Sequence, residues 1–274
     1  MEIGYLGPKG TFSHMAVKKV CGSGDVAIEY PTIFSLIKAV DSGEIKKAVV
    51  PTENAIEGSV NPTLDTLAFD ADVHITGELI LDIEQNLLVK KGIAEKDIKE
   101  IASMSQPIGQ CQGMLNSSFP GVKLIFTNST AEAAKIASES DGSCACIASA
   151  ESAELYGLDI LKRNCSDRKN NCTKFITIEK QPIFEVTDND KSSVVFTVDN
   201  KPGALYEVLK YFSDSHINMT RIESRPSKRV LGEYVFFVDI DGNADNPEVY
   251  FALDNIRRNS VYYKFLGSYR KAEN

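Results

Sequence analysis

Short apolar runs of strand length alternate along the first part of the chain with segments that have the apolar periodicity of helices. A further helix is predicted after Asn61-Pro62, because asparagine caps helices and proline fits the first turn. Strands that alternate with helices indicate an α/β layer structure with a largely parallel sheet. The predicted strands are residues 2–6, 26–30 and 47–50, and the predicted helices are residues 12–21 and 33–40.

A second set of alternating elements follows a strand-rich segment at residues 73–89. We expect the chain to build one α/β lobe, cross to a second, and return near residues 157–162. Two lobes with a cleft form a natural site for a small molecule. The predicted strands of the second set are residues 98–103, 123–127 and 145–148, and its predicted helices are residues 107–115, 129–138 and 150–156.

The last third of the chain has a different pattern. Residues 181–191 are polar and irregular, which predicts a linker. A β-α-β-β-α-β order then predicts a ferredoxin-like module, with elements at residues 192–198, 204–212, 217–224, 232–240, 247–258 and 261–266. The expected domains are residues 1–180, with lobes at about 1–75 plus 160–180 and at 76–159, and residues 192–270.

Length and charge narrow the choice of partner and compartment. The 274 residues suit two domains. The formal net charge of −8 makes nucleic acid and anionic membranes poor partners for the whole surface. No apolar run approaches the roughly 20 residues of a membrane span, and the first residues lack the basic start and apolar core of a signal peptide. We therefore expect a cytoplasmic protein.

The six cysteines and three histidines do not stand at the spacing of a zinc site. Free thiols in a reducing compartment are the expected state, and no metal site is predicted. Cys144 and Cys146 are expected on one strand, with one thiol on each face of the sheet.

A glycine-rich turn, Gly7-Pro8-Lys9-Gly10-Thr11, joins the first predicted strand to the first helix. Such a turn can cradle an anion, because free backbone N–H groups and the helix dipole point at it. Such a turn is more often an ordinary tight connection between a strand and a helix, although the sequence alone does not decide between the two interpretations. Another predicted strand ends in Pro51-Thr52-Glu53-Asn54, and sheets of this class bind ligands at the carboxyl ends of their strands.

Short motifs occur in a fixed order along nearly the whole chain. In the first domain they are Gly7-Pro8-Lys9-Gly10-Thr11-Phe12-Ser13, Val50-Pro51-Thr52-Glu53-Asn54, Gly58-Ser59-Val60, Thr63-Leu64-Asp65, Gln110-Cys111, Ala148-Ser149, Tyr156-Gly157-Leu158 and Asn171-Cys172-Thr173-Lys174-Phe175. In the second they are Lys201-Pro202-Gly203-Ala204-Leu205 and Glu223-Ser224-Arg225-Pro226. Together they resemble the monofunctional prephenate dehydratases, in which a catalytic domain precedes an ACT regulatory domain.

The resemblance implies a two-lobed, periplasmic-binding-protein-like catalytic domain and a ferredoxin-like ACT domain. It implies that the chain converts prephenate to phenylpyruvate, with loss of water and carbon dioxide, in L-phenylalanine biosynthesis. It also implies feedback inhibition by L-phenylalanine and a homo-oligomer, either a dimer or a tetramer, without a cofactor. Two alternatives stay open: an arogenate dehydratase, whose substrate has an amino group in place of the keto group, and a non-enzymatic sensor of amino acids or aromatic acids.

The resemblance assigns roles to individual residues. Thr173 is implied as the hydrogen-bond donor at the leaving hydroxyl, and because a threonine is a poor acid, this role needs a partner that the sequence does not name. The other implied catalytic residues are Asn54, Ser103 and Gln110, and the implied substrate-binding residues are Thr11, Glu53, Lys174 and Phe175. The implied L-phenylalanine contacts are Gly203, Ala204, Leu205, Asn218, Glu223, Ser224, Arg225 and Pro226.

The chain departs from the family pattern at two places. Lys174 stands where the family usually has arginine, which keeps the positive charge but loses the planar bidentate fork. Met104-Ser105 stands where the family usually has His-Pro. We expect Lys174 to anchor a substrate carboxylate or to fix the threonine loop.

Overall fold

The computed structural model describes residues 1–181, 186–228 and 230–272. Four residues of the predicted linker, 182–185, lie outside this part of the chain. The described residues form two compact units. Unit 1 comprises Met1–Leu36, Val49–Val60 and Ile80–Phe175, and unit 2 comprises Ile37–Ala48, Asn61–Leu79 and Ile176–Asn274.

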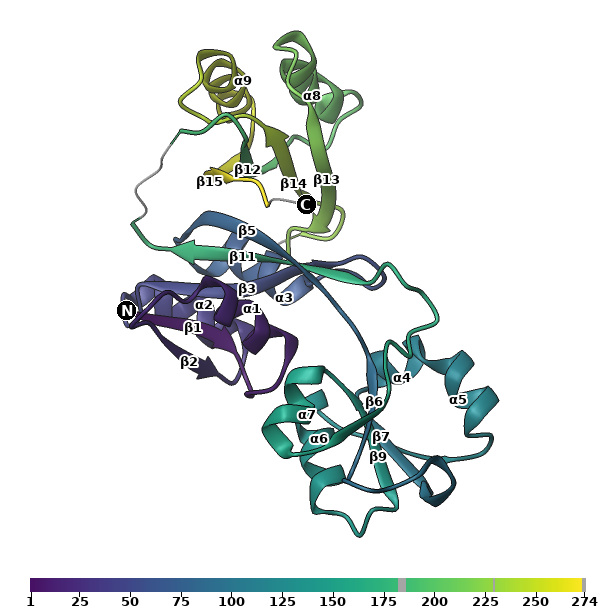
Figure 1. Cartoon of the computed structure of the whole chain (residues 1–274). Coiled ribbons are helices and arrows are strands. Elements are labelled where there is room, and N and C mark those ends of the chain that lie inside the picture. Colours follow the sequence, from purple (N-terminus) through teal and green to yellow (C-terminus); the bar gives the residue numbers. More distant parts are fainter. Residues whose placement is uncertain (182–185, 229, 273–274) are drawn as a thin grey trace. The chain divides into compact units, whose positions relative to one another are not determined.

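The N-terminal strands belong to a six-stranded sheet of order β2-β1-β3-β11-β5, with β4 beside β3 (Figure 1). Its members are β1 (Glu2–Leu6), β2 (Val26–Tyr30), β3 (Lys47–Asn54), β4 (Gly58–Ser59), β5 (His74–Asp82) and β11 (Cys172–Glu179). The helices of this part are α1 (Phe12–Val20), α2 (Ile33–Ser42), α3 (Asn61–Asp65) and the π-helical turn η1 (Thr66–Asp70). The predicted strands and helices of this region are confirmed, with β3 four residues longer than expected.

A five-stranded sheet of order β10-β6-β9-β7-β8 lies wholly within unit 1. Its strands are β6 (Asn86–Val89), β7 (Glu100–Ser103), β8 (Lys123–Phe126), β9 (Cys144–Ala148) and β10 (Asp159–Lys162). Its helices are η2 (Glu95–Asp97), α4 (Ser105–Gln110), α5 (Gln112–Ser118), α6 (Thr130–Glu139) and α7 (Ala150–Tyr156). Because β10 pairs with β6, the chain rejoins the six-stranded sheet only with β11.

Strand β9 separates two apolar clusters of the five-stranded sheet. Ala145 and Ile147 pack into one cluster, whereas Cys144 and Cys146 pack into the other. The expectation of one thiol on each face is therefore wrong, because residues two apart in a strand share a face. All six cysteines are free, as predicted.

The C-terminal module is a four-stranded antiparallel sheet of order β13-β14-β12-β15, which is the expected ferredoxin-like arrangement. Its elements are β12 (Asp190–Thr197), α8 (Ala204–Asp214), β13 (Met219–Pro226), β14 (Tyr234–Asp241), α9 (Pro247–Arg258) and β15 (Tyr262–Arg270). Figure 1 shows α8 and α9 on one face of this sheet. Buried Phe196, Val238, Phe212 and Leu253 join the helices to the strands.

Within unit 2 the C-terminal sheet contacts residues 61–79 closely. Lys264 of β15 donates to the carbonyl oxygens of Leu67, at 2.7 Å, and of Ala71. A Cβ atom at Gly267, whose φ is +138°, would lie 2.3 Å from the carbonyl oxygen of Ile75. Only glycine therefore allows the two backbones to approach at this point.

Candidate active site

The end of β3 and the start of β11 bring the predicted polar residues together. The backbone N–H of Ala55 donates to the carbonyl of Cys172 at 2.9 Å, and the hydroxyl of Thr52 donates to the carbonyl of Lys174 at 3.2 Å. These bonds place Asn54 beside Thr173. Strand β4 pairs back on Glu53 and Asn54 and so forms a tight hairpin at this edge.

The amide of Asn54 has a fixed orientation. Its Oδ1 accepts from the backbone N–H groups of Ile56 and Glu57, each at 3.0 Å. The amino group therefore points the other way, and its Nδ2 lies 3.0 Å from Oγ1 of Thr173 and 2.8 Å from Oδ1 of Asn171. Asparagine commonly forms this turn with the N–H groups that follow it.

Thr173 is held as an acceptor by Asn54, which leaves its own hydroxyl proton free to be donated elsewhere. A hydroxyl has one donor and two acceptor positions. An N–H bond to its oxygen also stabilises the negative charge that develops when the proton is shared with a leaving group. Asn54 is therefore a candidate for the partner that the sequence could not name.

Gln110, at the end of α4, joins the same set of side chains. Its Oε1 accepts from Nδ2 of Asn171 at 3.0 Å and from Nε2 of Gln85 at 3.4 Å, and its Nε2 lies 3.1 Å from Oε1 of Glu57. The backbone N–H of Asp167 donates to the carbonyl of Gln110 at 2.8 Å and so holds the end of α4. Sequence reasoning missed Asn171, Glu57 and Gln85 as site residues, although Asn171 belongs to the quoted Thr173 motif.

Lys174 and Glu53 form an ion pair, with Nζ and Oε2 3.0 Å apart. The side chain of Lys174 is 23% exposed and that of Glu53 is 38% exposed. An uncompensated carboxylate would repel an anionic ligand, and the pairing with Lys174 compensates the charge of Glu53. Phe175 is almost fully buried, at 1% exposure, and packs in the core.

Two other candidates lie apart from these contacts. Ser103 ends β7 with no exposed surface, and its hydroxyl donates to the carbonyl of Ile147 at 2.7 Å. Thr11 caps α1, where its hydroxyl accepts from the N–H of His14 and donates to the carbonyl of Pro8. The proposed substrate contacts of both residues stay predictions.

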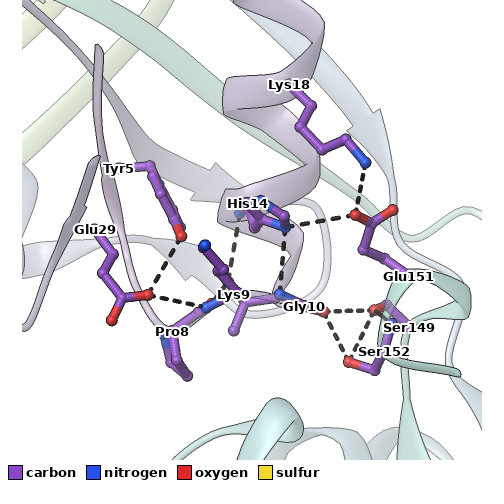
Figure 2. A network of polar contacts seen from close by, with 11 residues as sticks. Tyr5, Pro8, Lys9, Gly10, His14, Lys18, Glu29, Ser149, Glu151 and Ser152 are labelled. Atoms are coloured by element: carbon purple, nitrogen blue, oxygen red, sulfur yellow. Dashed lines mark hydrogen bonds and ion pairs between the residues drawn. The ribbon is translucent and has the colours of Figure 1, made fainter. Parts of the chain in front are cut away.

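The glycine-rich turn makes contacts within the protein itself (Figure 2). The N–H of Lys9 donates to Oε2 of Glu29, and the N–H of Gly10 donates to Nδ1 of His14, both at 3.3 Å. The carbonyl of Gly10 accepts from the hydroxyls of Ser149 and Ser152, at 2.7 and 2.8 Å. These contacts favour the structural interpretation of the turn over an anion cradle.

His14 also faces a carboxylate in Figure 2. Its Nδ1 lies 3.5 Å from Oε1 of Glu151, which pairs with Lys18 at 2.7 Å. Burial lowers the pKa of His14, although the nearby Glu151 opposes this shift. Nδ1 accepts a hydrogen bond from the N–H of Gly10, which requires that this nitrogen carries no proton and that the imidazole is neutral. The histidine therefore holds the turn in place and does not act as a charged group.

The predicted L-phenylalanine contacts lie on α8 and β13. Gly203 precedes α8 with a φ of +83°, and Ala204 and Leu205 begin the helix. Nδ2 of Asn218 donates to Oδ2 of Asp241 at 2.8 Å. The backbone of Arg225 pairs with β14, but its guanidinium reaches outside the sheet, where it binds Asp65 through two hydrogen bonds and also donates to Asn61.

Two further findings concern ligands and membranes. Across residues 1–181, 186–228 and 230–272, we find no group of three or more His, Cys, Asp and Glu side chains placed to bind a metal ion. None of the helices in the described ranges combines the length and the apolar character that crossing a membrane requires.

Comparison with known proteins identifies both parts of the chain. The family profile described as prephenate dehydratase matches residues 3–183, and the ACT domain profile matches residues 192–258. A prephenate dehydratase of Methanocaldococcus jannaschii is 42% identical, and the alignment covers 97% of this chain and 96% of that protein.

Two solved structures share the fold. Prephenate dehydratase from Arthrobacter aurescens, in complex with L-Phe, superposes with a TM-score of 0.92 at 33% identity and covers 98% of this chain and 90% of that one. GqqA, described as a novel type of quorum quenching acylase, has a TM-score of 0.88 at 29% identity and covers 99% and 98% of the two chains.

Proposed function

Because the chain belongs to the prephenate dehydratase family, we propose that it converts prephenate to phenylpyruvate, carbon dioxide and water. The observation that carries this proposal is the pairing of Asn54 with Thr173. The amide donates to the threonine oxygen at 3.0 Å, and the threonine proton is left for a second acceptor. The hydroxyl group that leaves prephenate is such an acceptor.

The reaction needs orientation more than strong acid chemistry. When the ring carboxylate leaves as carbon dioxide, its bonding electrons enter the ring, and the C–O bond to the hydroxyl breaks as the ring becomes aromatic. The departing oxygen takes up one proton and leaves as water. We propose that Thr173 provides the hydrogen bond that assists this departure, while Asn54 stabilises the charge on the threonine oxygen.

Prephenate carries two carboxylates, so the site can bind it only if the protein's own carboxylates, Glu53 and Glu57, have partners. Glu53 faces Lys174, and Glu57 accepts a hydrogen bond from Gln110. We propose that Lys174 shares its charge between Glu53 and a substrate carboxylate. A lysine can do this as a point charge, without the fork of the arginine that the family usually has.

We further propose that L-phenylalanine binds the ACT domain and inhibits the enzyme, as the bound L-Phe of the Arthrobacter relative suggests. The start of α8 offers backbone N–H groups to a carboxylate, and β13 is an edge strand whose outer side has no partner among the described strands. A second copy of the chain beside β13 would complete such a site. Light scattering with and without L-phenylalanine would distinguish a dimer from a tetramer.

The test is to mix the purified chain with prephenate and to follow phenylpyruvate formation. We expect Thr173→Ala to lower kcat roughly 100-fold with little change in KM, and Thr173→Ser to recover part of the rate, because serine keeps the hydroxyl. An alanine variant with the wild-type kcat would remove Thr173 from the mechanism.

Other substrates decide between the competing functions. A higher kcat/KM for arogenate than for prephenate would reassign the chain to the arogenate dehydratases. Tight binding of prephenate without turnover would indicate a sensor. Cleavage of an N-acyl amide without turnover of prephenate would indicate an acylase.

A further inference from the structure

The hydrogen bonds of four residues in the site close into a ring in which every donor points the same way. The backbone N–H of Glu57 donates to Oδ1 of Asn54, and Nδ2 of Asn54 donates to Oδ1 of Asn171. Nδ2 of Asn171 donates to Oε1 of Gln110, and Nε2 of Gln110 donates to Oε1 of Glu57. The four distances are 3.0, 2.8, 3.0 and 3.1 Å in this order.

Glu57 sets the direction of the ring, because both of its groups have fixed polarity. Its backbone N–H only donates, and its ionised carboxylate only accepts. A carboxamide can be placed either way round, so the orientations of Asn54, Asn171 and Gln110 depend on their neighbours. If one of these amides were turned over, its oxygen would face another oxygen on one side, and its amino group would face another N–H donor on the other side.

The orientation of Asn54 decides what Thr173 can do. In the ring its amino group faces Oγ1 of Thr173, and the threonine proton is available to a ligand. If the amide of Asn54 were reversed, its oxygen would accept that proton and withdraw it from the substrate. Two backbone N–H groups, the carbonyl of Cys172, which accepts from Nδ2 at 3.1 Å, and the chain of amides that ends at Glu57 thus favour the same, productive orientation.

We propose that Glu57 is a positioning residue, which acts through Gln110 and Asn171 to hold Asn54 in the orientation that makes Thr173 a donor to the substrate. The proposal rests on the function proposed above and adds to it a residue that touches none of the reacting atoms. Glu57 lies on the exposed turn between β3 and β4, so its replacement leaves the core unchanged.

The first experiment replaces the acceptor at position 57. We expect Glu57→Met to lower kcat roughly tenfold or more while KM changes less, because misorientation of a donor weakens the transition state more than it weakens binding. Glu57→Gln should restore most of the rate, since its side-chain oxygen can still accept from Gln110. Glu95→Met, which removes a charge from the exposed helix η2, is the matched control and should leave kcat unchanged.

The second experiment reverses part of the ring. In Asn171→Asp the ionised side chain has no donor, so Gln110 must turn its amino group toward residue 171 and its oxygen toward the carboxylate of Glu57. Adding Glu57→Gln supplies a donor to that oxygen. We therefore expect Glu57→Gln to raise kcat at least threefold in the Asn171→Asp background but not in the wild type. A merely structural role of Glu57 would not make the effect of its replacement depend on residue 171 in this way.

The outcomes separate the two proposals. Wild-type conversion of prephenate together with a normal kcat for Glu57→Met would overturn the positioning role alone. A double variant no faster than Asn171→Asp, with both variants folded by circular dichroism, would do the same. Failure of the wild type to convert prephenate would instead overturn the proposed function, and the positioning role with it.

Discussion

Replacing Asp65 with alanine would remove the anion that two cationic side chains of the C-terminal module share. Oδ1 of Asp65 accepts from Nε of Arg225 at 2.9 Å, and Oδ2 accepts from Nη2 at 3.1 Å. Lys228 adds a contact of 2.7 Å. The side chains of Asp65 and Arg225 are only 14% and 16% exposed, so water screens this pair little.

These contacts set the expected loss of stability. Removing one partner of a fully buried ion pair lowers the free energy of unfolding by about 3–5 kcal/mol, whereas an exposed pair contributes about 0–1 kcal/mol. Because the Arg225 bond is bidentate and largely but not fully buried, we expect a loss of about 2–3 kcal/mol for Asp65→Ala. Asp65→Asn keeps one acceptor and should lose about 1–2 kcal/mol.

The assay is urea unfolding of the full chain, with Asp214→Asn as the control. Asp214 pairs with Lys210, but both side chains are more than half exposed, so this variant should unfold like the wild type. An Asp65→Ala variant as stable as the control would refute the reasoning, because it would show that the buried pair gains nothing over a solvated one.

The Asp65→Asn variant also tests whether the pair of Asp65 and Arg225 transmits feedback inhibition. Arg225 belongs to a motif proposed to contact L-phenylalanine, and Asp65 lies on α3 of the preceding domain. We expect Asp65→Asn to raise the concentration of L-phenylalanine that halves activity about fivefold or more, the range of typical coupling energies, with uninhibited kcat unchanged. An unchanged inhibition curve would leave the pair a structural contact only.

The pH dependence of the free energy of unfolding provides a third test of the contacts of Asp65. Burial raises the pKa of Asp65, but the hydrogen bonds from Arg225 and Lys228 outweigh it and hold the pKa below its ordinary value of 3.8. The stabilisation is therefore present above pH 3.8 and is lost as the pH falls below it, toward the pKa of the folded state. The difference between the wild type and Asp65→Asn at pH 7 should narrow at pH 3.

Two further predictions concern the charged pair of the site and the thiols. Lys174→Arg should keep kcat/KM within about tenfold of the wild type, whereas Lys174→Met should lower kcat/KM roughly 100-fold at low salt. Adding Glu53→Gln to Lys174→Met should restore part of kcat/KM, because it removes the uncompensated carboxylate. Equal rates for the Met and Lys enzymes would show that the charge of Lys174 has no role in the reaction. A thiol reagent should modify only the half-buried Cys21 and Cys172 of the folded chain, because the other four thiols are buried and out of its reach. Fast reaction of a third thiol would contradict this.

Local pattern predicted the order of the elements well, because each strand or helix of this chain carries its own periodicity. It failed where a break depends on one residue. The single helix expected over residues 107–115 is two helices separated at Cys111, whose φ and ψ of −114° and 21° leave the helical region. It also missed that β10 pairs with β6, because strand partners are set by tertiary packing rather than by local sequence.

The site could be predicted only as far as its residues lie in motifs. Asn54, Gln110 and Thr173 were named from such motifs, and the structure brings them together through Asn171. Glu57 and Gln85 could not be named, because an exposed glutamate on a turn and a glutamine at a strand boundary have no local signal. Their contacts to Gln110 join segments 53 and 25 residues apart, which only the folded chain shows.

A reaction driven by aromatisation explains why such a site contains amides rather than a strong acid. The free energy that drives the reaction comes from aromatisation of the substrate ring, and the protein needs only to orient a hydrogen-bond donor toward the departing oxygen. A carboxylic acid near a dianion would be repelled when ionised, whereas neutral amides orient a hydroxyl without adding charge. The one ionised group of the ring, Glu57, lies at its exposed end and reaches Thr173 only through Gln110, Asn171 and Asn54. In the proposed mechanism, this arrangement lets a carboxylate fix the direction of the hydrogen bonds while its negative charge stays away from the substrate.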